Sequence, residues 1–371
     1  MFREEIKSLN TIKKNFLYRF LKILSDRCGI LQKYYTLKKL YYSTQVTYQI
    51  RALLRKKQTR PILITYDLSC SPVSYGDFFQ TLLLCRFFMV KNKKVELAVI
   101  TSTLRKDMQE HLPQEILNQR LKEFKAMAQI LLKTNPSTFI SWKEFSESYL
   151  QQAERYEIVP SLKWVKKRKA FYQAHFNVLQ NLSKTLSPKE LSEFLLKAEE
   201  FNSFIVKPLP FSDFISWHVR YWPYWENGRS LSESEFIKTH QMLQKMFPDK
   251  PIVLISDTKG TKVYEDFAKK NHIPVYSCKA YTASFLGDVA LILKSSFFLQ
   301  IRGGGVGNSA FFSTVPYLFV TRQRTMNELF LFSEAPPWAT PKQKLYFEAA
   351  CEDRPLKDLS YYIECYQEIT T

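Results

Sequence analysis

A run of glycines is the most specific candidate for a ligand contact in this sequence. Residues 303–307 read Gly-Gly-Gly-Val-Gly and are followed by Asn308 and Ser309. Glycine lets a backbone approach a ligand without a Cβ atom, and free N–H groups at a helix start favour anions. The run matches neither the GxGxxG fingerprint nor a P-loop, so a tight structural turn is the alternative. We favour a phosphate contact, made by Gly303, Gly304, Gly305, Gly307, Asn308 and Ser309.

A histidine and an arginine form the second candidate site. The segment Trp217-His218-Val219-Arg220 is expected at the carboxyl end of a strand, where residues two apart share a face. Arginine stays charged and grips phosphate with two N–H groups, so His218 and Arg220 suit an anionic nucleotide. An ordinary polar strand end is the alternative. Asp257 also ends a predicted strand, where it either faces a ligand or caps the following helix.

These residues require strands and helices that alternate along the chain. In the first half we expect strands at 61–66, 95–101 and 138–142 and helices at 78–90, 114–133 and 143–155. A helical connection over 163–200 contains Pro188, which starts a new helix. In the second half we expect strands at 214–219, 251–256, 273–276, 296–301 and 316–320, separated by helices at 232–247, 260–270, 285–294 and 308–313. Strand, helix and parallel strand in repetition predict an α/β protein with two Rossmann-like domains facing a cleft.

The chain divides into four predicted regions. They are a basic amphipathic helical segment (1–57), an N-terminal Rossmann-like acceptor domain with the helical connection (58–200), a C-terminal Rossmann-like donor domain (201–330) and a helical tail (331–371). Residues 1–60 carry fifteen Lys and Arg against three acids, which is +12 of the total formal charge of +19. This segment is expected either to lie on an anionic membrane surface or to pack as a helical cap on the main body.

Composition narrows the class of protein. Hydrophobic residues make up 45% of the chain, which excludes a mainly disordered protein. We find no apolar run long enough to span a bilayer and no secretion signal. The six cysteines include no CxxC pair, so we predict reduced thiols and a cytoplasmic protein, with peripheral contact at the inner membrane face as one possibility. Nucleic-acid binding is a weaker alternative, because the basic excess lies outside the predicted α/β halves.

Three segments together resemble a known enzyme superfamily. They are His218-Val-Arg220, Ile255-Ser-Asp257, and the stretch from Gly287-Asp288 to Leu299. These are similar to the motifs of the α1,2-, α1,6- and protein O-fucosyltransferases, over roughly residues 205–325. The resemblance implies a GT-B fold, a GDP-sugar donor, inversion at the anomeric carbon, no metal and no other cofactor. It also implies that Arg220 holds the β-phosphate, that His218 and Asp288 recognise the guanine edge, and that 303–309 wrap the diphosphate.

The resemblance also suggests where catalysis takes place. Glu226, six residues after Arg220, occupies the loop in which related enzymes keep a catalytic carboxylate, and we expect it to be the general base. Trp222 and Trp225 crowd the same loop and suit stacking on an acceptor sugar, or else form a hydrophobic plug. In the N-terminal half, Tyr75, Gly76 and Asp77 are expected on the acceptor side.

Two departures affect the identity of the donor. Several relatives carry a second basic residue after the motif arginine, where this chain has Tyr221, and their serine-rich loop is glycine-rich here. The predicted function is an inverting, metal-independent glycosyltransferase that uses a GDP-fucose-like nucleotide sugar to modify a glycan or glycolipid acceptor. A non-catalytic nucleotide-sugar-binding protein of the same fold is the alternative, and another GDP- or UDP-sugar is an alternative donor.

Overall fold

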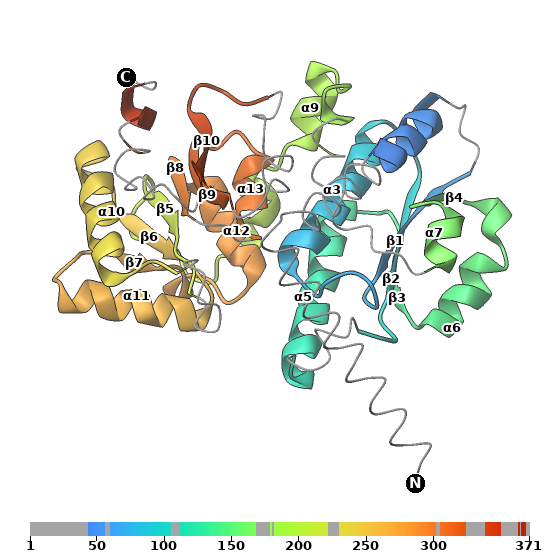
Figure 1. The fold of residues 1–371 in the computed structure, drawn as a ribbon, viewed down its shortest axis with the longest axis horizontal. Helices are drawn as coiled ribbons and strands as arrows, with labels where there is room; N and C mark the ends of the chain where they lie inside the picture. The colour runs from blue at the N-terminus through green and yellow to red at the C-terminus, as the bar shows by residue number, and fades with distance from the viewer. Residues whose placement is uncertain are drawn as a thin grey trace, which may run out of the picture.

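The chain folds into two α/β domains that lie side by side, each built around one parallel sheet (Figure 1). The computed structural model describes residues 44–55, 60–104, 112–167, 179, 182–221, 230–301, 305–323, 338–349, 363 and 365–368. Every strand pairing within the two sheets is parallel. The predicted class, two parallel-sheet α/β domains, is therefore confirmed.

The N-terminal sheet has four strands in the order β3-β2-β1-β4. These are β1 (Ile62–Asp67), β2 (Val95–Ile100), β3 (Ser137–Ile140) and β4 (Glu157–Val159). The first three lie where the apolar runs predicted them. β4 was not predicted, because three residues are too short to give a period; it pairs with β1 from Ile62↔Glu157 onward.

Helices cover both faces of this sheet. α3 (Tyr75–Val90) and α5 (Gln114–Leu132) cover the face toward the C-terminal domain, and α6 (Trp142–Phe145) and α7 (Leu162–Lys166) cover the other (Figure 1). The prediction of a single α-helix over 143–155 is wrong. The chain instead makes α6, a π-helical turn (Ser146–Leu150) and a 3₁₀ turn (Ala153–Arg155), while the Tyr149 ring packs against Phe145 at 5.5 Å and Tyr156 at 5.4 Å.

The described part of the predicted connection over 163–200 is helical in several pieces. It contains the end of α7, helical residues at 179, 182 and 183, then α9 (Pro188–Phe194) and the start of a 3₁₀ turn (Ala198–Phe204). Pro188 occupies the first turn of α9 behind a Ser187–Glu190 capping box, so the predicted helix start is confirmed. Residues 168–178, 180 and 181 lie outside the described part of the chain.

The C-terminal sheet has six strands in the order β10-β9-β8-β5-β6-β7. They are β5 (Ile215–His218), β6 (Ile252–Ile255), β7 (Tyr276–Ser277), β8 (Phe297–Ile301), β9 (Tyr317–Gln323) and β10 (Gln343–Ala349). The prediction of a helical tail over 331–371 is wrong at residues 343–349, which form β10. This strand extends the C-terminal sheet beyond residue 330. The buried Gln343 amide fixes the start of β10 by donating to the carbonyls of Ser313 and Val315, both at 3.0 Å.

The helices of this domain again form two layers. α10 (Glu233–Met246) and α11 (Thr258–Lys270) cover the outer face, and α12 (Phe285–Lys294) and α13 (Gly307–Phe311) cover the face toward the N-terminal domain (Figure 1). The predicted Ser232–Glu235 capping box opens α10. Ile215 and Trp217 of β5, and Val219 directly after it, belong to the outer core, which leaves Ser216 and His218 on the inner face.

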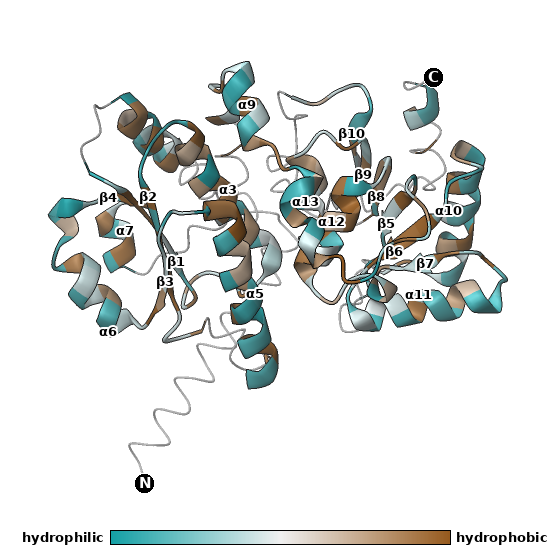
Figure 2. Cartoon of the chain, turned by 180° about the vertical axis from the view of Figure 1, so that it is seen from behind, coloured by the Kyte–Doolittle hydropathy of each residue, from teal (hydrophilic) through white to brown (hydrophobic). Residues whose placement is uncertain are grey.

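The two domains share one hydrophobic core. Buried residues of α3 and α5 continue without interruption into those of α12 and α13, and Figure 2 shows hydrophobic residues along α3 and α12 where the domains meet. The helix over residues 44–55 packs on this core through Val46, Ile50 and Leu53. No helix in the described ranges has the length and apolar character that crossing a bilayer requires.

Candidate functional site

The C-terminal sheet reverses its strand order between β5 and β8. From β5 the chain proceeds to β6 and β7 on one side, and β8, β9 and β10 follow on the other. In open α/β sheets this switch point is where ligands bind, outside the carboxyl ends of the strands. His218 ends β5 and lies opposite Gln300, the next-to-last residue of β8.

His218 and Gln300 each carry a buried polar atom without a hydrogen-bond partner. These atoms, within the described structure, are Nδ1 of His218 and Oε1 of Gln300. Both side chains lie on the inner face, because Phe297, Leu299 and Ile301 of β8 take the outer face as Trp217 does on β5. Burial, together with the positive charge of Arg220, lowers the pKa of His218 to about 3. The imidazole is therefore neutral near pH 7 and suits an uncharged hydrogen-bonding partner.

Gln300 was missed in the sequence, although a signal was present. It is the only polar side chain in Phe-Phe-Leu-Gln-Ile, which is otherwise an apolar buried strand. The amide of Gln300 lies against Gly307, the last residue of the glycine run at 303–307, called the glycine loop below. A Cβ atom added to Gly307 would lie 2.0 Å from Oε1 of Gln300. A side chain at position 307 would therefore have to displace the amide of Gln300.

Arg220 follows β5 and begins the predicted catalytic loop. Its carbonyl accepts a 2.8 Å hydrogen bond from the hydroxyl of the buried Tyr264, which also accepts from the backbone N–H of Leu231 at 2.8 Å. One hydroxyl of α11 therefore holds both ends of the segment between Arg220 and Leu231. Three predicted residues in it, Trp222, Trp225 and Glu226, lie outside the described residues.

The glycine loop meets the N-terminal domain directly. A Cβ atom on Gly305 would lie 2.6 Å from the backbone nitrogen of Gly76, and one on Gly76 would lie 2.7 Å from Cα of Gly305. Asn308 strengthens the contact by donating from Nδ2 to the carbonyl of Gly76 at 3.1 Å. These glycines are required for close packing between the domains, whatever ligand the loop also contacts. Gly303 and Gly304 lie outside the described residues.

The predicted acceptor-side residues form the start of α3. Ser74 caps this helix, accepting from the N–H of Asp77 at 3.2 Å and donating to its carboxylate. The Tyr75 ring stacks on Phe285 of α12 at 4.5 Å. Burial, and then the nearby Glu123 carboxylate, raises the pKa of Tyr75, so the phenol stays protonated. The switch-point face, the glycine loop and this helix start are thereby brought together.

The remaining predicted residues have structural partners. Asp257 caps α11 by accepting from the N–H of Gly260 at 2.7 Å, the helix-cap alternative of the two considered. The Asp288 carboxylate is buried and accepts from Lys279 at 2.7 Å and from Thr282 at 2.7 Å. The buried Ser309 hydroxyl donates to the carbonyl of Val306 at 2.7 Å. Contact between these three residues and a donor stays a prediction.

The described structure contains neither a disulfide among Cys85, Cys278 and Cys365 nor a cluster of metal ligands. Burial raises the pKa of Cys278 to about 12. Across the described ranges, no three His, Cys, Asp or Glu side chains gather in a geometry that could hold a metal ion.

Comparison with known proteins yields structural likenesses only. No family model and no curated protein matches the chain. Escherichia coli heptosyltransferase WaaC with ADP is 10% identical, with 84% of this chain and 100% of that chain covered and a TM-score of 0.44. E. coli ADP-heptose LPS heptosyltransferase II is 11% identical, with 83% and 99% covered and a TM-score of 0.42. A family 9 glycosyl transferase from Veillonella parvula DSM 2008 is 12% identical, with 84% and 90% covered and a TM-score of 0.39. Likenesses at this level carry no argument about the chemistry of this chain.

Proposed function

We propose that this chain is a glycosyltransferase that binds a nucleotide-sugar donor at the switch point between β5 and β8. The observation that carries the proposal concerns two buried polar atoms, one on His218 and one on Gln300, that have no hydrogen-bond partner among the described residues. Both side chains face the N-terminal domain beside the glycine loop. A buried polar atom without a partner is costly, so such a pair favours a site that a ligand completes.

The chemistry of the two groups indicates which part of the donor they bind. A neutral imidazole and an amide oxygen suit the base or ribose, which offer uncharged donors and acceptors. The diphosphate needs a permanent positive charge, and Arg220 supplies one at the end of β5. A GDP-fucose-like donor follows from the motif resemblance and is part of this proposal.

The proposed reaction is a single displacement with inversion. Glu226 removes the proton from an acceptor hydroxyl, the hydroxyl oxygen attacks the anomeric carbon, and the nucleoside diphosphate departs with the bonding electron pair. Arg220 stabilises the charge on the leaving group, and Tyr264 positions the loop by holding its two ends. The acceptor, a glycan or glycolipid, approaches from Tyr75, Gly76 and Asp77, with Trp222 and Trp225 stacking on its sugar.

Donor binding is tested by a thermal-shift screen of GDP-, UDP- and dTDP-sugars. A donor at 100 times its Kd should stabilise the fold by about 2.7 kcal/mol. Arg220→Ala should weaken the best donor by roughly ten- to a hundredfold and leave the fold intact, because Tyr264 bonds the backbone of residue 220. Lys262→Ala, an exposed change on α11, is the control. Unchanged affinity in Arg220→Ala would remove the phosphate role.

Catalysis is tested with Glu226→Gln, which keeps the shape of the side chain but removes the basic oxygen. Slow hydrolysis of the donor by water substitutes for transfer to an unidentified acceptor. Turnover should fall by about 10²–10⁴, with donor affinity retained. A wild-type protein that binds donor but never hydrolyses it would favour the non-catalytic alternative, and inhibition by EDTA would contradict metal independence.

We further propose that the basic N-terminal segment contacts an anionic membrane surface. Deleting all of 1–57 would remove Val46, Ile50 and Leu53 from the shared core, so the appropriate deletion is 1–43. This variant should lose affinity for anionic vesicles and keep its donor affinity. If the full-length chain and the shortened variant bind vesicles equally well, the alternative holds, in which the segment packs as a helical cap on the main body.

A further inference from the structure

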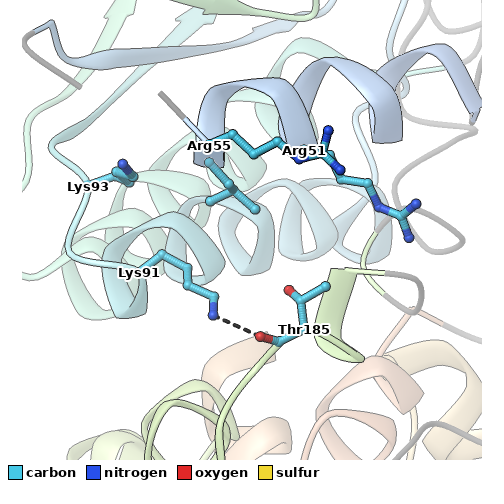
Figure 3. Close-up of a pocket in the computed structure, with 6 residues that line it drawn as sticks. Arg51, Arg55, Lys91, Lys93 and Thr185 are labelled. Carbon is cyan, nitrogen blue, oxygen red and sulfur yellow. Dashed lines mark hydrogen bonds between the residues drawn. The ribbon is translucent and has the colours of Figure 1, made fainter. Parts of the chain in front are cut away.

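A basic pocket of about 540 Å³ lies in the N-terminal domain (Figure 3). Its lining comprises Arg51, Leu54, Arg55, Lys91, Lys93 and Thr185. Arg55 precedes β1, and Lys91 and Lys93 precede β2, so the pocket lies at the amino edge of the sheet. The start of α3 and the proposed donor site belong to the carboxyl edge, so this pocket is separate from them.

Two arginines on a fixed helix form one wall. Arg51 and Arg55 are four residues apart and share a face, where like charges repel each other. Both are exposed, and neither has an ion-pair partner within the described ranges. Their helix is held by the buried Ile50 and Leu53 and by Gln49, whose Nε2 donates to the carbonyl of Ile158 at 2.7 Å. The fold thus fixes the helix turn from which both arginine side chains project.

Lys91 forms the opposite wall and is itself fixed. Its Nζ donates to the carbonyl of Thr185 at 2.8 Å, drawn in Figure 3, and to Oε2 of Glu190 at 2.7 Å. Glu190 balances one positive charge. The two arginines on the facing wall therefore keep the pocket positively charged.

We propose that this pocket binds a phosphate-bearing ligand, with Arg51 and Arg55 as its principal contacts. Guanidinium groups match the oxygens of phosphate with paired N–H donors and keep their charge at any physiological pH. The volume is in the range of small-molecule sites, and Leu54 adds an apolar wall, so the ligand is a phosphorylated sugar or headgroup rather than a bare ion. The phosphate belongs either to a soluble compound or to an anionic lipid.

The test compares two variants of the full chain that lose the same charge. Arg51→Gln/Arg55→Gln removes the proposed contacts, and Lys122→Gln/Lys143→Gln removes two exposed lysines elsewhere in the same domain. Calorimetry measures binding of inorganic pyrophosphate, and co-sedimentation measures binding to phosphatidylglycerol vesicles, with phosphatidylcholine vesicles as the neutral reference. We expect the arginine variant to bind at least about tenfold more weakly than the lysine variant in one of these arms.

The arm that shows the difference identifies the source of the phosphate. A selective loss of pyrophosphate binding indicates a soluble ligand, and a selective loss of vesicle binding indicates a lipid headgroup. Equal behaviour of the two variants in both arms, or no saturable binding by the wild type, would overturn the proposal. Far-UV circular dichroism checks folding, and the single change Arg51→Gln replaces the double variant if that variant does not fold.

Discussion

His218 and Asp288 are both buried polar residues of the C-terminal domain, and their surroundings give them different chemistry. The Asp288 carboxylate has Lys279 and Thr282 as partners and so anchors the packing around α12. Within the described structure His218 has no hydrogen-bond partner at Nδ1, and burial keeps the imidazole neutral. Of the two, His218 retains a hydrogen-bonding atom for a ligand.

The neutral state of His218 makes stability depend on pH. Its pKa is near 6.5 in an unfolded chain and about 3 when folded, so the unfolded state binds more protons between these values. Stability should therefore fall as pH decreases from 6.5 toward 3, by roughly 2–3 kcal/mol at pH 4.5 from this group. Urea unfolding at pH 7 and 4.5 measures the loss, which His218→Asn should reduce.

The control for this measurement is His272→Asn. His272 is exposed and has a φ of 54°, a conformation that asparagine also adopts. This variant should lose as much stability on acidification as the wild type. Equal losses in His218→Asn and wild type would show that the buried imidazole is not the source of the dependence.

For individual residues, the sequence could reveal which side chains are able to bind a ligand, but not which other side chains they contact. His218 and Val219 lie on opposite faces of the sheet as the spacing of a strand predicts. The partner of Asp288 could not be predicted, because Lys279 reaches it through a turn over 278–284 whose shape depends on tertiary packing. Glu123, which accepts from the N–H of Phe285 in the other domain at 3.4 Å, was missed for the same reason.

Among the elements, the start of α3 and the glycine loop meet through two glycines. Alanine is the better helix former by up to about 1 kcal/mol, so propensity alone predicts that Gly76→Ala stabilises α3. The structure predicts the opposite, because the new Cβ atom would lie 2.7 Å from Cα of Gly305. We expect a loss of about 1–3 kcal/mol in unfolding free energy, measured in urea.

A double-mutant cycle isolates this contact. Once one Cβ atom has separated the two backbones, the second has less to displace, so Gly76→Ala/Gly305→Ala should cost clearly less than the sum of the single changes. Additive costs would show that the two glycines act independently, and the close approach would then not explain them.

Elements with a clear local pattern were predictable, whereas β4 and β10 were not. α12 begins and ends at the predicted residues, Phe285 and Lys294, and the strands before it lie within a few residues of their predictions. β4, with three residues, and β10, beyond the predicted domain, are specified by neighbouring strands and by the Gln343 amide rather than by local pattern. Tertiary pairing overrides local propensity in both cases.

For the whole molecule, the dominant feature is the core that both domains share. It joins Phe79 of α3 to Phe285 of α12, with ring centroids 6.3 Å apart, and Phe194 of α9 to Phe312 at 6.0 Å. Separating the domains would expose these rings to water. The pairing of the two domains is therefore part of the folding free energy of each.

This predicts one cooperative unfolding transition for a two-domain chain. Scanning calorimetry should give a single peak, with the calorimetric and van't Hoff enthalpies equal. Phe285→Ala, which removes the ring between Tyr75 and Phe79, should broaden or divide the peak. Two resolved transitions in the wild type would contradict a shared core.

The shared core also limits how this protein can change over evolutionary time. Domains with independent cores can be exchanged between genes as modules, because each brings its own stability. Here a graft of either sheet alone would leave the facing surfaces of α3, α5, α12 and α13 unmatched. These four helices must therefore be inherited together. A chimera that folds would have to keep all four helices from the same parent and exchange only segments that lie farther from the domain boundary.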